Sequence, residues 1–240
     1  MKKTIGIVFA DTMEYSPFLC FAKEKGGTES IRRGNDSVSF TLEKSARSIE
    51  IIGVKCGIGK VNAASATAFL ISEDSADFIL NAGLSGAVQR LRREDIVAAE
   101  SYVECDYDLT AIGYALGEKP DGQRYLYSAD ETLLSIALRN PTVKKAKTGT
   151  GDVFLTDKAK KELFKDTFGI EAFDMETAAI ASVCDKCGIP MLSLRKISDD
   201  ADDCSTDDYR EMNERQELCL TELLGEICEG ILLEDSLWDK

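Results

Sequence analysis

The sequence predicts an α/β fold in one domain, built around a largely parallel or mixed sheet. Short apolar runs typical of buried strands alternate along the chain with helix-like segments. Glycine-containing turns join several of these segments, and no repeat, low-complexity tract or flexible linker separates them. The length of 240 residues fits one α/β domain. We therefore expect residues 1–240 to form a single domain.

The first half of the chain contains strand-like segments and one alanine-rich helix. The helix follows a glycine-rich turn, and the strand after it runs into a second glycine-containing turn. The expected strands cover residues 4–10, 37–43, 48–56, 77–88 and 96–108, and the first turn with its helix covers residues 57–74.

The second half alternates more evenly between helices and strands. One helix begins with acidic residues in its first turn, and another ends at Gly188 with Pro190 just beyond, which is a well-formed stop signal. A long amphipathic helix closes the chain. The expected helices cover residues 129–140, 157–168, 176–187 and 209–233, and the expected strand segments cover residues 143–154, 169–175 and 189–198.

Composition argues against several classes of protein. The formal net charge of −14 disfavours binding to the phosphate backbone of nucleic acids, which needs clustered lysine and arginine. No apolar run is long enough to span a membrane, and the N-terminus lacks the apolar core of a secretory leader. We expect a cytoplasmic protein that acts on a neutral or cationic small molecule and keeps its eight cysteines as reduced thiols.

The chain contains no histidine, and this directs the search for chemistry. Ser-His-Asp and Cys-His catalytic groups are excluded, as are zinc sites based on histidine. Proton transfer near neutral pH must then use carboxylates, lysine, tyrosine or cysteine with shifted pKa values. Carboxylates are the leading candidates.

Three carboxylates follow the ends of expected strands. Glu14 is expected in a loop after the first strand, Glu176 at the start of a helix, and Asp199 at the end of the strand over residues 189–198. Each has a structural alternative, such as surface exposure for Glu14 or stabilisation of the helix dipole for Glu176. Because ligands in open α/β sheets bind beyond the carboxyl ends of the strands, we expect the three to share one pocket.

Three other motifs are weaker signals. The stretch "CGIGK" at residues 56–60 lacks the spacing of a nucleotide-binding P-loop, and the Cys-x-x-Cys pair at residues 184–187 has no partner pair. The aspartate-rich stretch at residues 199–203 lacks the glycine and the closing glutamate of a calcium loop. We expect neither a metal site nor a cofactor, and we expect Asp202, Asp203, Asp207 and Asp208 to be solvated.

Four ordered motifs resemble the bacterial 5′-methylthioadenosine/S-adenosylhomocysteine nucleosidases, within the wider purine nucleoside phosphorylase superfamily. They are "IGIVFADTMEY", "CGIGKVNAA", "DLTAIGYALGEKP" and "FDMETAAIASVC…SLRKISDDAD". The resemblance runs nearly from end to end. It implies a mixed, partly barrel-like central sheet flanked by helices, a homodimer, and hydrolysis of the N-glycosidic bond of 5′-substituted adenosines.

The resemblance also implies catalytic roles. Glu14 would activate the attacking water, Glu176 would bind the ribose hydroxyls, and Asp199 would donate a proton to N7 of the purine. In this reading the aspartates next to Asp199 help to keep it protonated.

Further residues of this sequence match substrate-binding positions of the family. Met175 would pack beside the sugar, and Ser198 and Arg195 would support Asp199. Phe154 and Leu155 would bind the base. The other expected contacts are Tyr209 over the pocket and an apolar lining for the 5′ group, lent in part by a neighbouring subunit, from Ile58, Leu109, Ile112 and Pro120.

Two alternatives stay open. A phosphate-dependent nucleoside phosphorylase would carry an arginine and then a serine where this chain has Asn81 and Leu84, so water is the favoured nucleophile. A non-catalytic nucleoside-binding protein on the same fold is the other alternative. Leu84 and Asp200 also depart from the nucleosidase pattern, which suggests a shifted 5′ preference. The candidate substrates are methylthioadenosine, S-adenosylhomocysteine, 5′-deoxyadenosine and futalosine-type nucleosides.

Overall fold

The computed structural model describes residues 1–123, 125–201 and 220–238. Their core is a mixed sheet of ten strands. Buried strands such as β1 carry nearly continuous apolar runs because both faces of the sheet are covered there. The strands are β1 (Lys2–Phe9), β2 (Thr28–Arg32), β3 (Asn35–Lys44), β4 (Arg47–Lys55), β5 (Phe78–Ala87), β6 (Ile96–Glu104), β7 (Leu126–Ser128), β8 (Val143–Thr150), β9 (Ala172–Asp174) and β10 (Met191–Asp199).

Part of this sheet closes into a barrel. The order β10-β6-β8-β9-β5 returns to β10, because β5 pairs with β9 on one side and with β10 on the other. The pairs β10–β5, β6–β8 and β8–β9 are parallel, whereas β10–β6 and β5–β9 are antiparallel. The expected mixed, partly barrel-like sheet is thus confirmed.

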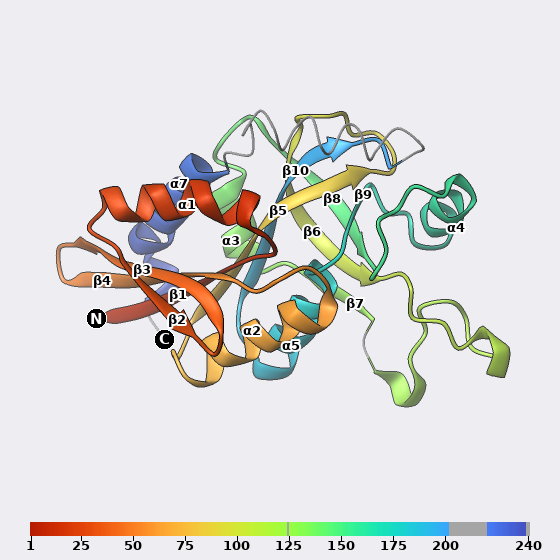
Figure 1. The fold of residues 1–240 in the computed structure, drawn as a ribbon, viewed down its shortest axis with the longest axis horizontal. Helices are drawn as coiled ribbons and strands as arrows, with labels where there is room; N and C mark the ends of the chain where they lie inside the picture. The colour runs from red at the N-terminus through yellow and green to blue at the C-terminus, as the bar shows by residue number, and fades with distance from the viewer. Residues whose placement is uncertain (124, 202–219, 239–240) are drawn as a thin grey trace.

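The remaining strands extend the sheet outward from β5 in the order β1, β4, β3 and β2, and β7 pairs with β6. Helices α1 and α7 lie on one side of these outer strands, and α2 and α5 lie together on the other side (Figure 1). The helices of the described residues are α1 (Thr12–Glu24), α2 (Lys60–Ser72), α3 (Glu131–Ala137), α4 (Lys158–Phe168), α5 (Thr177–Cys187) and α7 (Thr221–Leu233).

Two expectations about local structure were wrong. Residues after the first strand form α1 rather than a loop, because Asp11 caps the helix by accepting a hydrogen bond from the Glu14 backbone N–H at 3.0 Å. The second glycine-containing turn does not exist either. Strand β5 continues through Gly83 and Gly86, because both glycines pair with β10.

Most other expected elements are confirmed, and α5 ends at Gly188 in the left-handed conformation, as the stop signal predicted. The sequence reading did not include β2 and β7. Of the expected helix over 209–233, the structure shows Thr221–Leu233 as α7, and residues 209–219 lie outside the described residues. Within the described part of the chain, no helix combines the length and apolar character needed to cross a bilayer.

Candidate active site

A cavity of about 330 Å³ opens where β1, β5, β9 and β10 end. Its volume lies in the range of pockets that hold small organic ligands. The sequence placed the site at this edge of the sheet. The lining residues are Ala10, Asp11, Glu14, Ile58, Leu84, Ser85, Gly86, Val153, Phe154, Leu155, Phe173, Asp174, Met175, Glu176, Ser198, Asp199 and Ala201.

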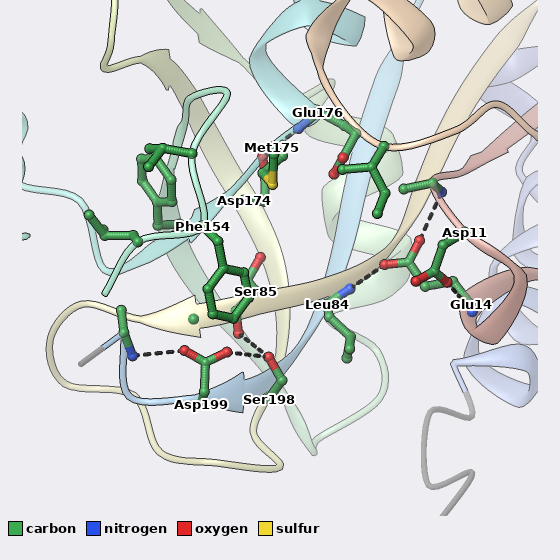
Figure 2. Close-up of a pocket in the computed structure, with 17 residues that line it drawn as sticks. Asp11, Glu14, Leu84, Ser85, Phe154, Asp174, Met175, Glu176, Ser198 and Asp199 are labelled. Atoms are coloured by element: carbon green, nitrogen blue, oxygen red, sulfur yellow. Dashed lines mark hydrogen bonds between the residues drawn. The ribbon is translucent and has the colours of Figure 1, made fainter. Parts of the chain in front are cut away.

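Glu14 projects into this cavity from the first turn of α1 (Figure 2). Its two carboxylate oxygens accept hydrogen bonds from the backbone N–H groups of Ala10 at 2.8 Å and Leu84 at 2.9 Å. Burial raises the pKa of Glu14 to about 8, although the charge of Arg195 opposes the rise. The group is thus held in one position and keeps its proton to unusually high pH.

Glu176 is the N-cap residue of α5 and is buried. Its Oε1 atom accepts a hydrogen bond from the Gly59 backbone N–H at 3.0 Å, in the turn that precedes α2. Its Oε2 atom lies 3.7 Å from a guanidinium nitrogen of Arg195. Burial raises the pKa of Glu176, and the guanidinium opposes that rise.

Asp199 is the last residue of β10 and lies across the cavity from Glu14 (Figure 2). Its carboxylate accepts hydrogen bonds from the Ser198 hydroxyl at 2.6 Å and from the Ala201 backbone N–H at 2.9 Å. Ser198 therefore supports Asp199, as the sequence suggested.

Arg195 does not support Asp199, and that expectation was wrong. The two residues are four positions apart on β10, which separates them by about 13 Å of extended strand. The Arg195 side chain is fully buried behind the cavity. It contacts Asp174 at 3.2 Å and Thr177 at 2.7 Å, so its positive charge lies on the Glu176 side of the site.

The wall between Asp199 and Glu176 is apolar and aromatic. Phe154 and Met175 face the cavity from the loop before α4 and from the end of β9 (Figure 2). Leu155 lines the same wall and is buried, whereas 42% of Phe154 is exposed. Ser85 also lines the cavity, and in the described residues its buried hydroxyl has no hydrogen-bond partner.

A family model described as the phosphorylase superfamily matches residues 4–229 of this chain. The chain belongs to the phosphorylase superfamily. The match spans all the described strands and helices that line the cavity, and it agrees with the resemblance found in the sequence.

Curated members of the superfamily that are similar to this chain are 5′-methylthioadenosine/S-adenosylhomocysteine nucleosidases. The protein from Geobacillus sp. (strain WCH70) is 40% identical over 158 residues, which is 62% of this chain and 68% of that protein. The protein from Bacillus subtilis (strain 168) is 34% identical over 190 residues, which is 76% of this chain and 82% of that protein.

Solved structures of superfamily members share the fold. The 5′-methylthioadenosine/S-adenosylhomocysteine nucleosidase of Helicobacter pylori with butyl-thio-DADMe-Immucillin-A has a TM-score of 0.88 at 27% identity, covering 95% of this chain and 99% of that chain. A structure named futalosine hydrolase of Helicobacter pylori has a TM-score of 0.86 at 28% identity, covering 95% and 97%.

Three of the expected binding residues that the structure describes are not in the cavity that this single superfamily chain forms. Leu109, Ile112 and Pro120 lie in the segment between β6 and β7, which projects away from the barrel (Figure 1), and Ile112 is 69% exposed. A side chain on that projection cannot reach the cavity at the ends of the barrel strands of its own chain. Tyr209 lies outside the described residues.

The sequence reading of this superfamily member also missed cavity residues, notably Asp11 and Asp174. Asp11 is the N-cap residue of α1, and Asp174, just before α5, accepts hydrogen bonds from the backbone N–H groups of Glu176 at 3.1 Å and Thr177 at 3.0 Å. Asp11 precedes Glu14 by three residues, a spacing typical of a capping box. Asp174 likewise precedes Thr177 by three residues, and these spacings are the sequence signals that could have identified both aspartates.

Proposed function

We propose that this protein hydrolyses the N-glycosidic bond of 5′-substituted adenosines, such as methylthioadenosine and S-adenosylhomocysteine, to adenine and a 5-substituted ribose. The observation that carries the proposal is the convergence of Glu14, Glu176 and Asp199 on one cavity, each held by backbone N–H donors. The names of the curated relatives support the same reaction.

Asp199 is the proposed general acid for the leaving base. Cleavage of the bond places negative charge on the purine, and protonation at N7 neutralises that charge. The ring of Phe154 provides a face on which a purine can stack, next to the buried Leu155. The unpartnered hydroxyl of Ser85 gives a bound nucleoside a further hydrogen-bonding group on this side.

Glu176 and Glu14 are the proposed groups on the sugar side. Glu176 would accept hydrogen bonds from the ribose hydroxyls, with Met175 packed beside the sugar. Glu14 would take a proton from the attacking water after it has lost its own. The positive charge that develops on the ribose in the transition state is stabilised by these carboxylates.

Water is a better nucleophile than phosphate in this cavity. Five acidic residues line it, and its described lining contains no arginine or lysine: the acids are Asp11, Glu14, Asp174, Glu176 and Asp199. Enzymes that bind phosphate use arginine, lysine or clustered backbone amides for this purpose. The only nearby guanidinium among the described residues, that of Arg195, is fully buried and engaged with Asp174.

The 5′ end of the substrate lies on the open side of the cavity in this proposal, against Ile58, which is 51% exposed. We propose that the enzyme works as a homodimer in the cytoplasm. In the dimer Leu109, Ile112 and Pro120 of one copy would complete the apolar 5′ site of the other. Tyr209 remains a proposed aromatic contact.

Adenine release from methylthioadenosine tests this function. Wild-type protein should release adenine, and Glu14→Gln and Asp199→Asn should lower kcat by about 10²–10⁴. Calorimetry should show that both variants still bind methylthioadenosine. Asp166→Asn, on α4, exposed and outside the cavity lining, is the matched control and should keep full activity. A wild type that binds the nucleoside without turnover would instead support a binding protein.

A further inference from the structure

Five charged residues outside the cavity lining join four parts of the chain. Lys60 is the first residue of α2, Glu104 and Asp106 lie at the end of β6, and Asp152 lies in the loop before α4. Lys119 belongs to the projecting segment between β6 and β7 and contacts Glu104 at 2.7 Å. We refer to these five residues as the Lys60 cluster.

Three members of the cluster form a closed ring of contacts. The Lys60 ammonium lies 2.7 Å from Asp106 Oδ1, and the Lys60 backbone N–H donates to Asp152 Oδ1 at 2.8 Å. The second oxygen of Asp106 accepts a hydrogen bond from the Asp152 backbone N–H at 2.8 Å. Each residue of the ring is therefore held by the other two.

The ring is anchored to β6 by a fourth residue, and the Lys60 side chain is largely shielded from water. The Lys60 ammonium also contacts Glu104 at 2.9 Å, and the side chains of Lys60 and Glu104 are each only 18% exposed. Burial alone would lower the pKa of Lys60, but the carboxylates of Asp106 and Glu104 more than offset this and raise it. Lys60 thus stays charged, and its ion pairs are less weakened by solvent than those on an open surface.

The ring joins two segments that contribute to the cavity lining, one before α2 and one before α4. Lys60 directly follows Gly59, whose backbone N–H holds Glu176. Asp152 directly precedes Val153 and Phe154, which form the wall proposed for the base. The ring therefore sets the spacing between the sugar-binding carboxylate and the stacking ring.

Glycines allow this close approach of the two segments. A Cβ atom on Gly59 would lie 3.1 Å from Asp152 Oδ1, and a Cβ atom on Gly151 would lie 3.0 Å from Asp106 Cγ. Gly59 also has a φ of 100°, which disfavours any other residue. The two segments are packed together at the ring and not loosely adjacent.

We propose that Lys60 is a positioning residue for substrate binding, acting through Asp106 and Asp152 to hold the Gly59 and Phe154 segments at the separation that a nucleoside requires. This inference rests on the proposed function. Glu14 and Asp199 have donors outside the ring, at Ala10, Leu84, Ser198 and Ala201, so the chemical step does not depend on Lys60.

Lys60→Met tests the inference, because it keeps the length of the side chain and removes its charge. The variant should raise KM for methylthioadenosine about tenfold, equivalent to about 1.4 kcal/mol of binding free energy. Its kcat should change by less than about threefold, because an interaction used for binding alone leaves kcat unchanged. Amide hydrogen exchange at residues 151–155 should accelerate in the ligand-free protein, because Asp106, which accepts the hydrogen bond from the Asp152 backbone N–H, loses its contact with the Lys60 ammonium.

Lys145→Met is the matched control. Lys145 on β8 pairs with Glu100 on β6 at 3.0 Å, so it joins the barrel strands away from the cavity. It should leave KM, kcat and the exchange of residues 151–155 unchanged. Lys60→Arg retains the charge and should restore part of the lost affinity. Asp106→Asn should show the same pattern as Lys60→Met, and it provides the test if Lys60→Met fails to fold.

The inference is overturned if Lys60→Met melts like the wild type and shows unchanged KM and unchanged exchange at residues 151–155. A fall in kcat without a change in KM would also overturn it. If the wild type does not hydrolyse the nucleoside, the proposed function fails by itself. The exchange comparison needs no ligand, so it still decides whether Lys60 holds the loop.

Discussion

At the scale of single residues, glycines determine where the catalytic carboxylates can lie. A Cβ atom on Gly83 would lie 2.6 Å from a guanidinium nitrogen of Arg195 and closer still to Glu14 Oε1. A Cβ atom on Gly86 would lie 2.8 Å from Asp199 Oδ1. A glycine within a strand often marks a close approach of another group, and here two glycines of β5 make room for two proposed catalytic groups.

Replacement of Gly83 by alanine should therefore damage activity more than stability. Gly83→Ala must displace the Glu14 carboxylate, and a misplacement of about 1 Å costs about 10² in rate. The crowding should destabilise the fold by about 1–3 kcal/mol. Steady-state kinetics and urea unfolding measure the two effects. Gly225→Ala on α7, where the new Cβ would lie 3.3 Å from the edge of Phe21, should retain activity. Wild-type kcat in Gly83→Ala would contradict this account.

The pH dependence of the reaction should report Glu14. A general base acts only after it has lost its proton, and burial raises the pKa of Glu14 to about 8. In Asp199→Asn, where the proposed general acid no longer titrates, the residual kcat/KM should therefore rise with pH from 6 to 9. Its apparent midpoint should lie near that pKa and belong to the coupled pair of Glu14 and Glu176. A pH titration of kcat/KM measures this. A profile that is flat over this range would argue against Glu14 as the base.

At the scale of elements, α1 matters because it carries Glu14 in its first turn. The sequence did contain signals for this helix: Asp11 and Glu14 have capping-box spacing, and the buried residues Tyr15, Phe18 and Ala22 recur at helical intervals. The prediction of a loop for this segment was wrong, and Glu14 lines the cavity from a helix.

Loss of the α1 cap should affect both stability and catalysis. Asp11→Ala removes the hydrogen bond to the Glu14 backbone N–H and should destabilise the protein by about 1 kcal/mol. It should also lower kcat, because the first turn no longer holds Glu14. Asp11→Asn keeps a cap of similar strength and serves as the control. Chemical unfolding and kcat check the result, and equal behaviour of Asp11→Ala and the wild type would show that the cap is unimportant.

The strands were easier to predict than their ends. Strand β1 is recognisable because Ile5, Ile7 and Val8 are buried between two layers of helices, which gives a continuous apolar run. The sequence predicted a turn within the span of β5, because glycines such as Gly83 and Gly86 are typical of turns. In the structure the strand continues, and these glycines lie where other side chains approach it closely. Composition alone does not separate these two uses of glycine.

At the scale of the whole molecule, the closure of the barrel was not derivable from local patterns. It depends on pairings such as Leu192 with Leu80, which lie far apart in the sequence, and the sequence analysis expected the barrel only from a family resemblance. The same holds for Arg195. Its place on β10 was predicted, but its contact with Asp174 depends on how β10 and the end of β9 meet.

The proposed homodimer predicts a specific effect at the projecting segment between β6 and β7. Light scattering should give twice the mass of the chain. Ile112→Asp places a charge in the proposed 5′ site of the other subunit and should weaken binding of methylthioadenosine by about tenfold or more. Binding of adenine, which has no 5′ group, should not change and is the control in calorimetry. A monomer, or unchanged methylthioadenosine binding in Ile112→Asp, would refute the shared site.

The most direct test of water as the nucleophile is to follow the sugar product in water labelled with oxygen-18, with and without phosphate. We predict adenine and a 5-methylthioribose that carries one labelled oxygen, at a rate that phosphate does not change. A requirement for phosphate, with an unlabelled sugar phosphate as the product, would contradict the hydrolytic role assigned to Glu14.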